Sequence, residues 1–275
     1  MDINRTFVKT IDLTEIKKNQ KKEISEIKTF PVKSTLGEIK ENINISSKPS
    51  KEKIITKAFR LHLEGNISEA IKYYQYLINQ KTLDYRVYSN YGLILKDLGQ
   101  LKKSELSLKK SITLNPNSAQ TNYNLGKIYI DLQKLKEAEL VTRKAIKLDP
   151  TFALANLNLG KILKDLNNLK EAELYTRKAI MLNPDLAIAH YNLGNILKDL
   201  GQLTEAELSQ RKAIKIYPDL AESHLNLGSI LKELGNIKEA ELHTRKAISI
   251  NPNLAIAHLN LGNLLRDLGM LKEAE

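Results

Sequence analysis

Residues 187–220 read AIAHYNLGNILKDLGQLTEAELSQRKAIKIYPDL, and this stretch decides the fold. Its first half carries apolar side chains spaced three, one and three residues apart, which places them on one helical face. These side chains are Leu193, Ile196, Leu197 and Leu200. Gly201 then permits the left-handed conformation in which many helices end. Pro218 ends a second helical pattern, because proline disfavours helix in the residue before it. The stretch predicts two helices joined by a short turn.

The same pattern returns every 34 residues along most of the chain. Proline recurs at Pro116, Pro150, Pro184, Pro218 and Pro252, and glycine at Gly92, Gly126, Gly160, Gly194, Gly228 and Gly262. Counted from Lys51, the units are 51–84, 85–118, 119–152, 153–186, 187–220, 221–254 and a truncated seventh, 255–275. The first unit is degenerate, with Ala58 at the glycine position and Thr82 at the proline position. One helical hairpin cannot bury its apolar faces alone, so we predict an all-α solenoid over residues 51–275.

The composition is that of a soluble protein and narrows the possible chemistry. The 275 residues are 42% hydrophobic and 27% charged, with a net charge of +11 and no cysteine. The lack of cysteine excludes disulfides, thiolate metal sites and cysteine nucleophiles. No apolar run approaches the ~20 residues of a membrane helix, and residues 1–20 contain no hydrophobic signal block. We expect a cytoplasmic protein without a membrane partner.

The first fifty residues differ from the repeats. They contain ten basic and seven acidic residues, and Pro31 and Pro49 interrupt any long element. The segment offers too little apolar area to offset the entropy of ordering it. We predict a basic, disordered tail over residues 1–50, and a role as a partner-binding peptide stays open.

The repeat unit resembles the tetratricopeptide repeat (TPR). Small residues at positions 8, 20 and 27, such as Gly160, Ala172 and Ala179, carry the resemblance together with leucine at position 7 and proline at position 32. It extends over residues 51–275 and implies a right-handed superhelix whose first helices line a concave, partner-binding face. The chain departs from the family at position 24, usually aromatic, where it has Leu108, Thr142, Thr176, Gln210 and Thr244. Leucine appears instead at position 22, as Leu140, Leu174 and Leu208.

Position 6 of the first helix is asparagine in six consecutive units. The column is Asn90, Asn124, Asn158, Asn192, Asn226 and Asn260. An amide offers two donors and an acceptor, so amides at a fixed step can hydrogen-bond an extended peptide backbone. The wording NLGN-x-LK-x-LG is similar to the TPRs of O-linked N-acetylglucosamine transferases, whose concave surface carries an asparagine ladder. A packing role inside the repeats is the alternative.

Lysines on the same face complete the predicted peptide-binding surface. They are Lys127 and Lys161 at position 9, and Lys164, Lys198 and Lys232 at position 12. Position 13 carries a carboxylate in each unit from Asp97 to Asp267. The position-12 lysines can therefore form ordinary, weak ion pairs between repeats instead.

Other chemistries are not expected. His190, His224 and His258 lie one repeat apart and do not converge on one point, so we predict no metal site. Each Arg-Lys pair of the second helices, such as Arg177-Lys178, follows a glutamate four residues earlier, which compensates its charge and disfavours nucleic acid. The chain contains no P-loop, GxGxxG or HExxH motif, so we expect neither catalysis nor a cofactor.

Two functional hypotheses follow. The first is a scaffold or interaction module that binds an extended peptide or partner protein in the concave face. The alternative is the substrate-recognition arm of a larger glycosyltransferase-like enzyme, with a catalytic domain beyond residue 275. The truncated seventh unit is expected to leave Leu261, Leu264, Leu265 and Leu268 without most of their covering helix. Such an edge would be continued by more chain or would stack on another molecule.

Overall fold

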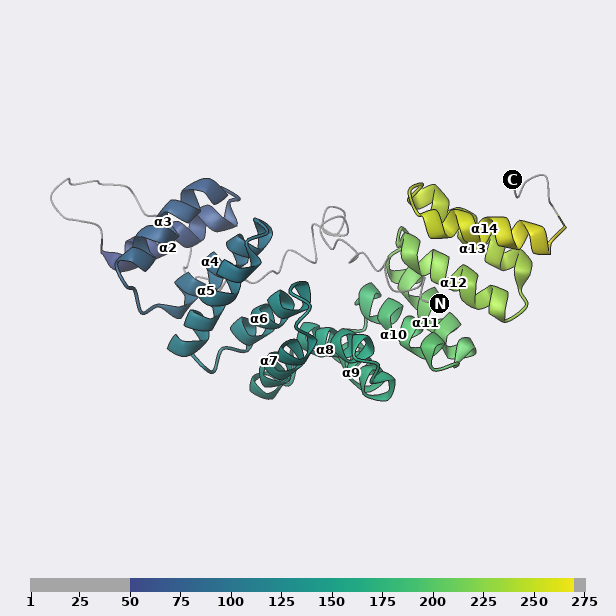
Figure 1. Cartoon of the computed structure of the whole chain (residues 1–275), viewed down its shortest axis with the longest axis horizontal. Helices are drawn as coiled ribbons and strands as arrows, with labels where there is room; N and C mark the ends of the chain where they lie inside the picture. Colours follow the sequence, from purple (N-terminus) through teal and green to yellow (C-terminus); the bar gives the residue numbers. More distant parts are fainter. Residues whose placement is uncertain (1–49, 270–275) are drawn as a thin grey trace. The chain divides into compact units, whose positions relative to one another are not determined.

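In a computed structural model of the chain, residues 50–269 are described (Figure 1). Within this range the structure contains thirteen helices and no strand. They are α2 (Lys51–Leu63), α3 (Ile67–Asn79), α4 (Tyr85–Asp97), α5 (Leu101–Leu114), α6 (Ala119–Asp131), α7 (Leu135–Leu148), α8 (Ala153–Asp165), α9 (Leu169–Leu182), α10 (Ala187–Asp199), α11 (Leu203–Ile216), α12 (Ala221–Glu233), α13 (Ile237–Ile250) and α14 (Ala255–Asp267). The all-α prediction is confirmed, with two helices in each 34-residue unit up to residue 254. The predicted tail, apart from Ser50, lies outside the described residues.

The turn inside each hairpin requires one residue with a left-handed backbone. Four of the six described hairpins use glycine there, at Gly65, Gly99, Gly201 and Gly235, with φ between 73° and 83°, and Gly269 (φ 75°) follows α14 in the same conformation. Two others place Gln133 (φ 59°) and Asn167 (φ 62°) at the equivalent position. A Cβ atom in this conformation crowds the following carbonyl oxygen, so these two turns are less favourable than the glycine turns.

We expect Gln133→Gly to raise the free energy of unfolding by about 1 kcal/mol, because glycine adopts the left-handed conformation without strain. The midpoint of urea unfolding, followed by circular dichroism, measures the change. Gly201→Gln is the reciprocal control and should lower the midpoint. Equal midpoints for both variants and the unaltered chain would contradict the strain argument.

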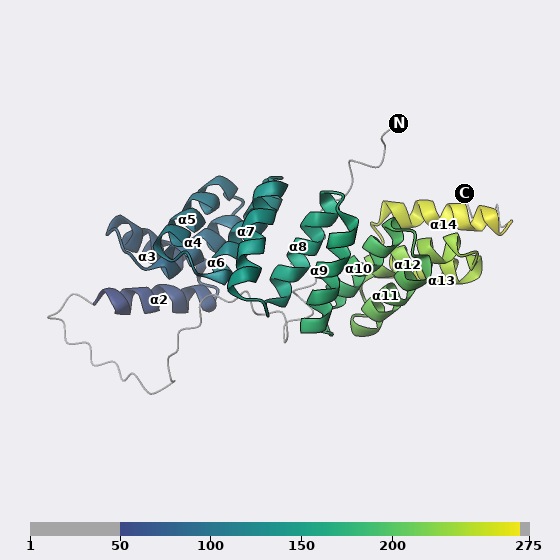
Figure 2. The ribbon, with the colours of Figure 1, turned by 90° about the horizontal axis from the view of Figure 1, so that it is seen from below.

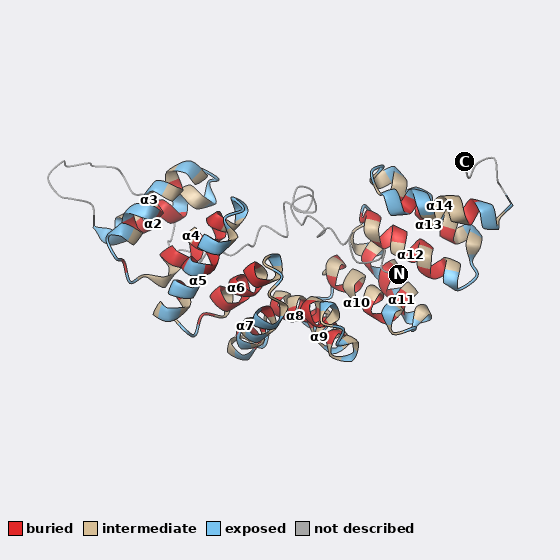
Figure 3. Cartoon of the chain, in the orientation of Figure 1, coloured by how far each residue is buried: buried red, intermediate tan, exposed pale blue. Residues whose placement is uncertain are grey.

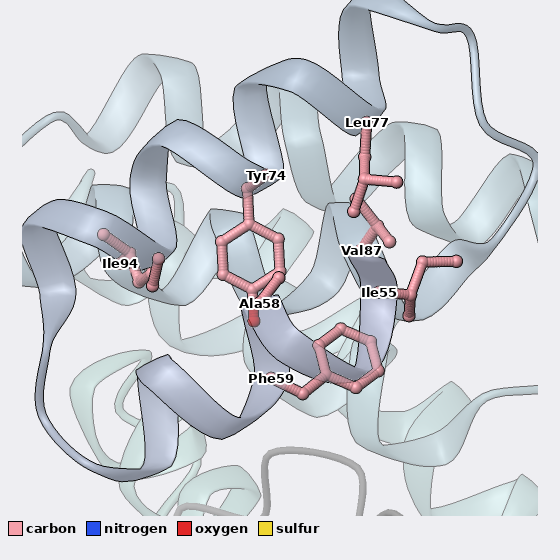
Figure 4. Close-up of a cluster of buried hydrophobic side chains, with 8 residues drawn as sticks. Ile55, Ala58, Phe59, Tyr74, Leu77, Val87 and Ile94 are labelled. Atoms are coloured by element: carbon pink, nitrogen blue, oxygen red, sulfur yellow. The ribbon is translucent and has the colours of Figure 1, made fainter. Parts of the chain in front are cut away.

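The helices form two compact units, with the boundary between Pro116 and Asn117. The first unit has a core built around Tyr74 and Phe59, whose ring centroids lie 6.1 Å apart (Figure 4). Ile55 and Leu77 are buried beside them. These aromatic and aliphatic side chains give the degenerate first repeat a packed core although it lacks the glycine and the proline.

The second unit contains α6 to α14. Each first helix packs on its own second helix, and each second helix on the next first helix. Successive first helices (α6, α8, α10, α12 and α14) also contact one another, which places them on the inner side of this stack (Figures 1 and 2). Buried residues such as Leu159 and Leu163 follow the faces between helices, while the outer sides of the second helices are exposed (Figure 3).

The departures from the repeat pattern on the second helices now have an explanation. The position-24 residues Leu108, Thr142, Thr176, Gln210 and Thr244 are fully buried although none is aromatic. Leucine at position 22 does not take over the role of the missing aromatic residue, because Leu140, Leu174 and Leu208 are all exposed. The position-24 threonines lie against the glycines of the facing first helices, and the buried hydroxyls of Thr176 and Thr244 donate to carbonyl oxygens of their own helices, at Ala172 and Ala240.

The last described helix corrects one expectation. Leu264 and Leu265 are buried, and Leu264 clusters with Leu227 and Leu231 of the preceding hairpin, while Leu261 and Leu268 are half-buried. The exposed large apolar residues of α14 are Ile256 and Leu259. Self-stacking of this edge stays a prediction. None of the helices within residues 50–269 has the length and hydropathy needed to span a bilayer.

Candidate functional site

The inner face of the second unit consists of the side chains at repeat positions 6, 9, 12 and 13 of its first helices. Contacts between neighbouring repeats define it. Asn226 at position 6 of α12 reaches position 9 of α10, and Lys164 at position 12 of α8 reaches position 13 of α10. The predicted stripe therefore exists as a polar surface shared by consecutive repeats.

The asparagine column occupies this face at varying depth. Asn124 is buried, while Asn158, Asn192, Asn226 and Asn260 are half-buried. Asn124 accepts a hydrogen bond from Gln120 Nε2 at 3.0 Å through Oδ1. Among the described residues, the Nδ2 groups of Asn124 and Asn158 have no hydrogen-bond partner. These amides therefore keep donor capacity that the fold does not use. Asn90 belongs to the first unit and is buried there.

The position-12 lysines bridge consecutive repeats. Their ammonium groups lie 2.8 to 2.9 Å from a position-13 carboxylate of the next repeat, in the pairs Lys164–Asp199, Lys198–Glu233 and Lys232–Asp267. Lys198 also donates to Ser229 Oγ at 2.6 Å. The position-12 lysines thus form the ion pairs between repeats that the sequence left open as the alternative to ligand binding. Partly exposed pairs of this kind contribute about 1 kcal/mol or less each.

The position-9 lysines lie one helical turn beyond the amides. Lys127 and Lys161 are half-buried, three residues after Asn124 and Asn158, so each shares a helix surface with its asparagine. The Lys127 ammonium lies 5.8 Å from the centroid of the Tyr123 ring. An amide and an ammonium side by side suit a carbonyl or carboxylate oxygen of a ligand.

A polar network that the sequence analysis missed links α10, α11 and α12. Gln210 Nε2 donates to Asn195 Oδ1 at 2.9 Å and to the backbone oxygen of Tyr191 at 3.2 Å. Asn226 Nδ2 donates to the same Asn195 Oδ1 at 2.7 Å. The signal was present in the sequence: this repeat alone combines glutamine at position 24 with asparagine at position 9, where the two preceding repeats have threonine and lysine. Asn226 therefore has a structural partner that Asn158 lacks.

The three histidines at position 4 form hydrogen bonds at the starts of their helices. His190, His224 and His258 each place Nε2 2.9 to 3.0 Å from the carbonyl oxygen of the proline six residues earlier, to which it donates. No group of three possible metal-ligating side chains occurs among residues 50–269. The histidines thus bond the start of each of these first helices to the turn that precedes it.

His224 also forms a pair with His243 of α13. Their Nδ1 atoms lie 3.0 Å apart, and their rings stack at 5.2 Å between centroids. Because His224 Nε2 holds a proton for Pro218, its Nδ1 is the acceptor when both rings are neutral. Burial lowers the pKa of both histidines, and the His224 ring and the Arg211 guanidinium lower the pKa of His243 further. If both rings were protonated, the two Nδ1–H donors would face each other across this contact and repel.

We expect the second unit to lose stability as the pH falls through the ordinary histidine pKa near 6.5. A histidine with a lowered folded-state pKa binds more protons when unfolded, so the free energy of unfolding rises with pH across this window. His243→Gln should flatten the dependence, measured as urea midpoints between about pH 5 and 8. His258→Gln is the control, because His258 has no histidine neighbour within residues 50–269. The same slope in His243→Gln and the unaltered chain would contradict the pairing.

Comparisons with known proteins agree with this architecture. The fold and the repeated first-helix face define a helical-repeat protein. A model described as "Tetratricopeptide repeat" matches residues 85–118, 119–152, 153–186 and 221–254, and a model described as "TPR repeat" matches 194–235. Together they match more than half of the chain, which therefore belongs to the tetratricopeptide-repeat family. The four ranges of the first model coincide with the units counted from Lys51.

Solved structures show the same fold. YrrB, described as a TPR protein with an unusual peptide-binding site, is 25% identical over 67% of this chain and 95% of its own, with a TM-score of 0.56. MamA is 27% identical over 60% of this chain and 96% of its own, with a TM-score of 0.55. PilF of Pseudomonas aeruginosa is 19% identical over 70% and 86%, with a TM-score of 0.64, and shows the fold alone. No curated protein matches the sequence. These comparisons give no support to the glycosyltransferase alternative.

Proposed function

We propose that the chain is a protein-interaction module whose inner face in the second unit binds an extended peptide segment. The observation that carries the proposal is the unused donor capacity of Asn124 and Asn158. A buried, unsatisfied donor costs about 1–3 kcal/mol. Turning the Asn158 amide about its last, soft torsion interchanges Oδ1 and Nδ2 and offers the donor to a peptide carbonyl oxygen.

The surrounding charge fits a peptide rather than a highly charged polymer. The position-12 lysines are neutralised by carboxylates, so the face is polar without a continuous basic stripe. Lys127 and Lys161 add a local positive charge beside the two amides. Similarity to YrrB, whose printed description includes a peptide-binding site, supports the same class of ligand. Localisation in the cytoplasm stays a prediction, as does the assignment of residues 51–275 to one functional region.

A lysine footprint tests the proposal. A peptide is selected on the full chain from a phage-displayed random library, and lysines are then acetylated with and without that peptide. We expect protection of Lys127 and Lys161 on the inner face. Lys147 and Lys215, exposed on the second helices and outside both inner-face and outer-row positions, are matched controls that should react equally in both samples. Protection of the control lysines alone would contradict an inner-face site.

A further inference from the structure

A second surface lies on the outer side of the second unit. Leucine at position 22 is 61 to 71% exposed on four consecutive second helices, at Leu140, Leu174, Leu208 and Leu242. We name these four residues the outer leucine row. A single exposed leucine is ordinary. Here leucine is exposed at the same position of α7, α9, α11 and α13, the second helix of each hairpin in this unit. Exposed apolar patches that repeat in this way mark interaction sites.

The neighbours of this row are basic. Positions 18 and 26 lie one helical turn before and after each leucine, on the same side of the helix. They carry Lys136, Lys144, Lys170, Lys178, Lys212, Lys238 and Lys246, with Thr204 as the one exception. Within residues 50–269 none of these lysines forms a salt bridge of 4.0 Å or less, and all are exposed except the half-buried Lys178.

Within the described part of the chain, seven of the eight glutamates at positions 19 and 21 of these helices pair with an arginine, and only the exposed Glu137 does not. Arg177 binds Glu173 of its own helix at 2.8 Å and Glu205 of the next second helix at 2.5 Å. Arg143 and Arg211 repeat this arrangement with Glu139 and Glu171, and with Glu207 and Glu239. The arginine–glutamate chain occupies one side of the row and leaves the lysines as its uncompensated charge.

Charge complementarity selects the occupant. A second copy of the same surface would bring lysines against lysines. The first fifty residues of the chain carry ten basic and seven acidic residues, a net of +3, and are repelled as well. An anionic occupant with apolar side chains satisfies both features. Because the inner helices contact one another, the row lies on the outer side of the stack, where a flexible chain can follow successive helices better than a flat lipid surface can.

We propose that the outer leucine row binds an acidic segment of a partner protein, in which leucine-sized side chains alternate with glutamates or aspartates. The leucines of the two partners bury each other, and the lysines at positions 18 and 26 bind the carboxylates. This site is separate from the inner face and uses none of its residues. One chain can therefore hold two segments at once.

The test uses the full chain and a fluorescent synthetic peptide that repeats Leu-Glu-Glu. Fluorescence anisotropy should detect binding that weakens with added salt. The variant Leu140→Ser/Leu174→Ser/Leu208→Ser should weaken it at least about tenfold, since three apolar contacts are removed. Leu83→Ser is the matched control, because Leu83 is 77% exposed but lies outside the row. All four leucines are exposed, so the variants should keep the wild-type unfolding midpoint.

Four results would overturn the proposal. The first is no binding of the Leu-Glu-Glu peptide by the unaltered chain. The second is equal binding by the triple variant. The third is tighter binding of phosphatidylglycerol vesicles than of the peptide, abolished by the same three substitutions, which would assign the row to an anionic lipid surface. A Ser-Glu-Glu peptide separates charge from leucine contact, and binding as tight as that of Leu-Glu-Glu would also exclude a role for the leucines.

Discussion

Gly160→Ala should lower the free energy of unfolding of the second unit by about 1–3 kcal/mol, the usual cost of overpacking a dense interior. Gly160 lies where α8 crosses α9. An added Cβ would overlap Thr176 Oγ1 and lie 3.1 Å from the backbone oxygen of Ala172. The Thr176 hydroxyl cannot simply swing away, because it is fully buried and bonded to that same oxygen at 2.7 Å. Urea unfolding followed by circular dichroism measures the loss.

A double-mutant cycle identifies the cause. Thr176→Ala removes the overlapping oxygen, so Gly160→Ala/Thr176→Ala should be less destabilised than the sum of the two single variants. Gly201→Ala is a control for the loss of a glycine elsewhere. No atom lies within 4 Å of its added Cβ, and only the positive φ of 75° is strained. Strict additivity in the cycle would show that close packing of Gly160 on Thr176 is not the cause.

The repeat period was enough to predict the helices and their ends. The repeated glycines and prolines determine where helices turn and end through the conformation of their own backbone. Such local effects can be predicted from a single sequence. The residues that replace them show the limit: Gln133 and Asn167 adopt the glycine conformation because the hairpin demands it, not because their own preferences indicate it. Position 24 shows the same limit, since the burial of Thr176 follows from the approach of α8.

The sequence was enough to predict which side chains share the inner face. It was not enough to predict which of them form ion pairs or hydrogen bonds with each other. Spacing alone placed Asn158, Lys161 and Lys164 on one side of a helix. Whether Lys164 is available for a ligand depends on Asp199 of the next repeat, which lies 2.8 Å away only because consecutive first helices are neighbours. The contact of His224 with His243 likewise joins two helices of one hairpin at a distance that no spacing rule gives. Tertiary neighbours decide which polar groups remain for binding.

The asparagine column should separate into ligand-binding and structural members when it is mutated. Asn226 donates to Asn195 at 2.7 Å, so Asn226→Ala should cost about 0.5–1.5 kcal/mol of stability. Asn158 Nδ2 is buried without a hydrogen-bond partner among residues 50–269, so Asn158→Ala removes an unsatisfied group and should leave the urea midpoint equal or higher. The two variants thus differ in stability although the residue type and repeat position are the same.

Affinity should respond differently from stability. For the library-selected peptide, the triple variant Asn158→Ala/Asn192→Ala/Asn226→Ala should bind at least about tenfold more weakly, because Asn158 and Asn192 each lose a ligand hydrogen bond of about 0.5–1.5 kcal/mol. Asn158→Ala alone should weaken binding without weakening the fold, which a packing role cannot explain. Fluorescence anisotropy and urea unfolding of the same preparations measure both quantities. If the triple variant binds as tightly as the unaltered chain, the column serves packing, and the inner face must recognise its ligand through other side chains.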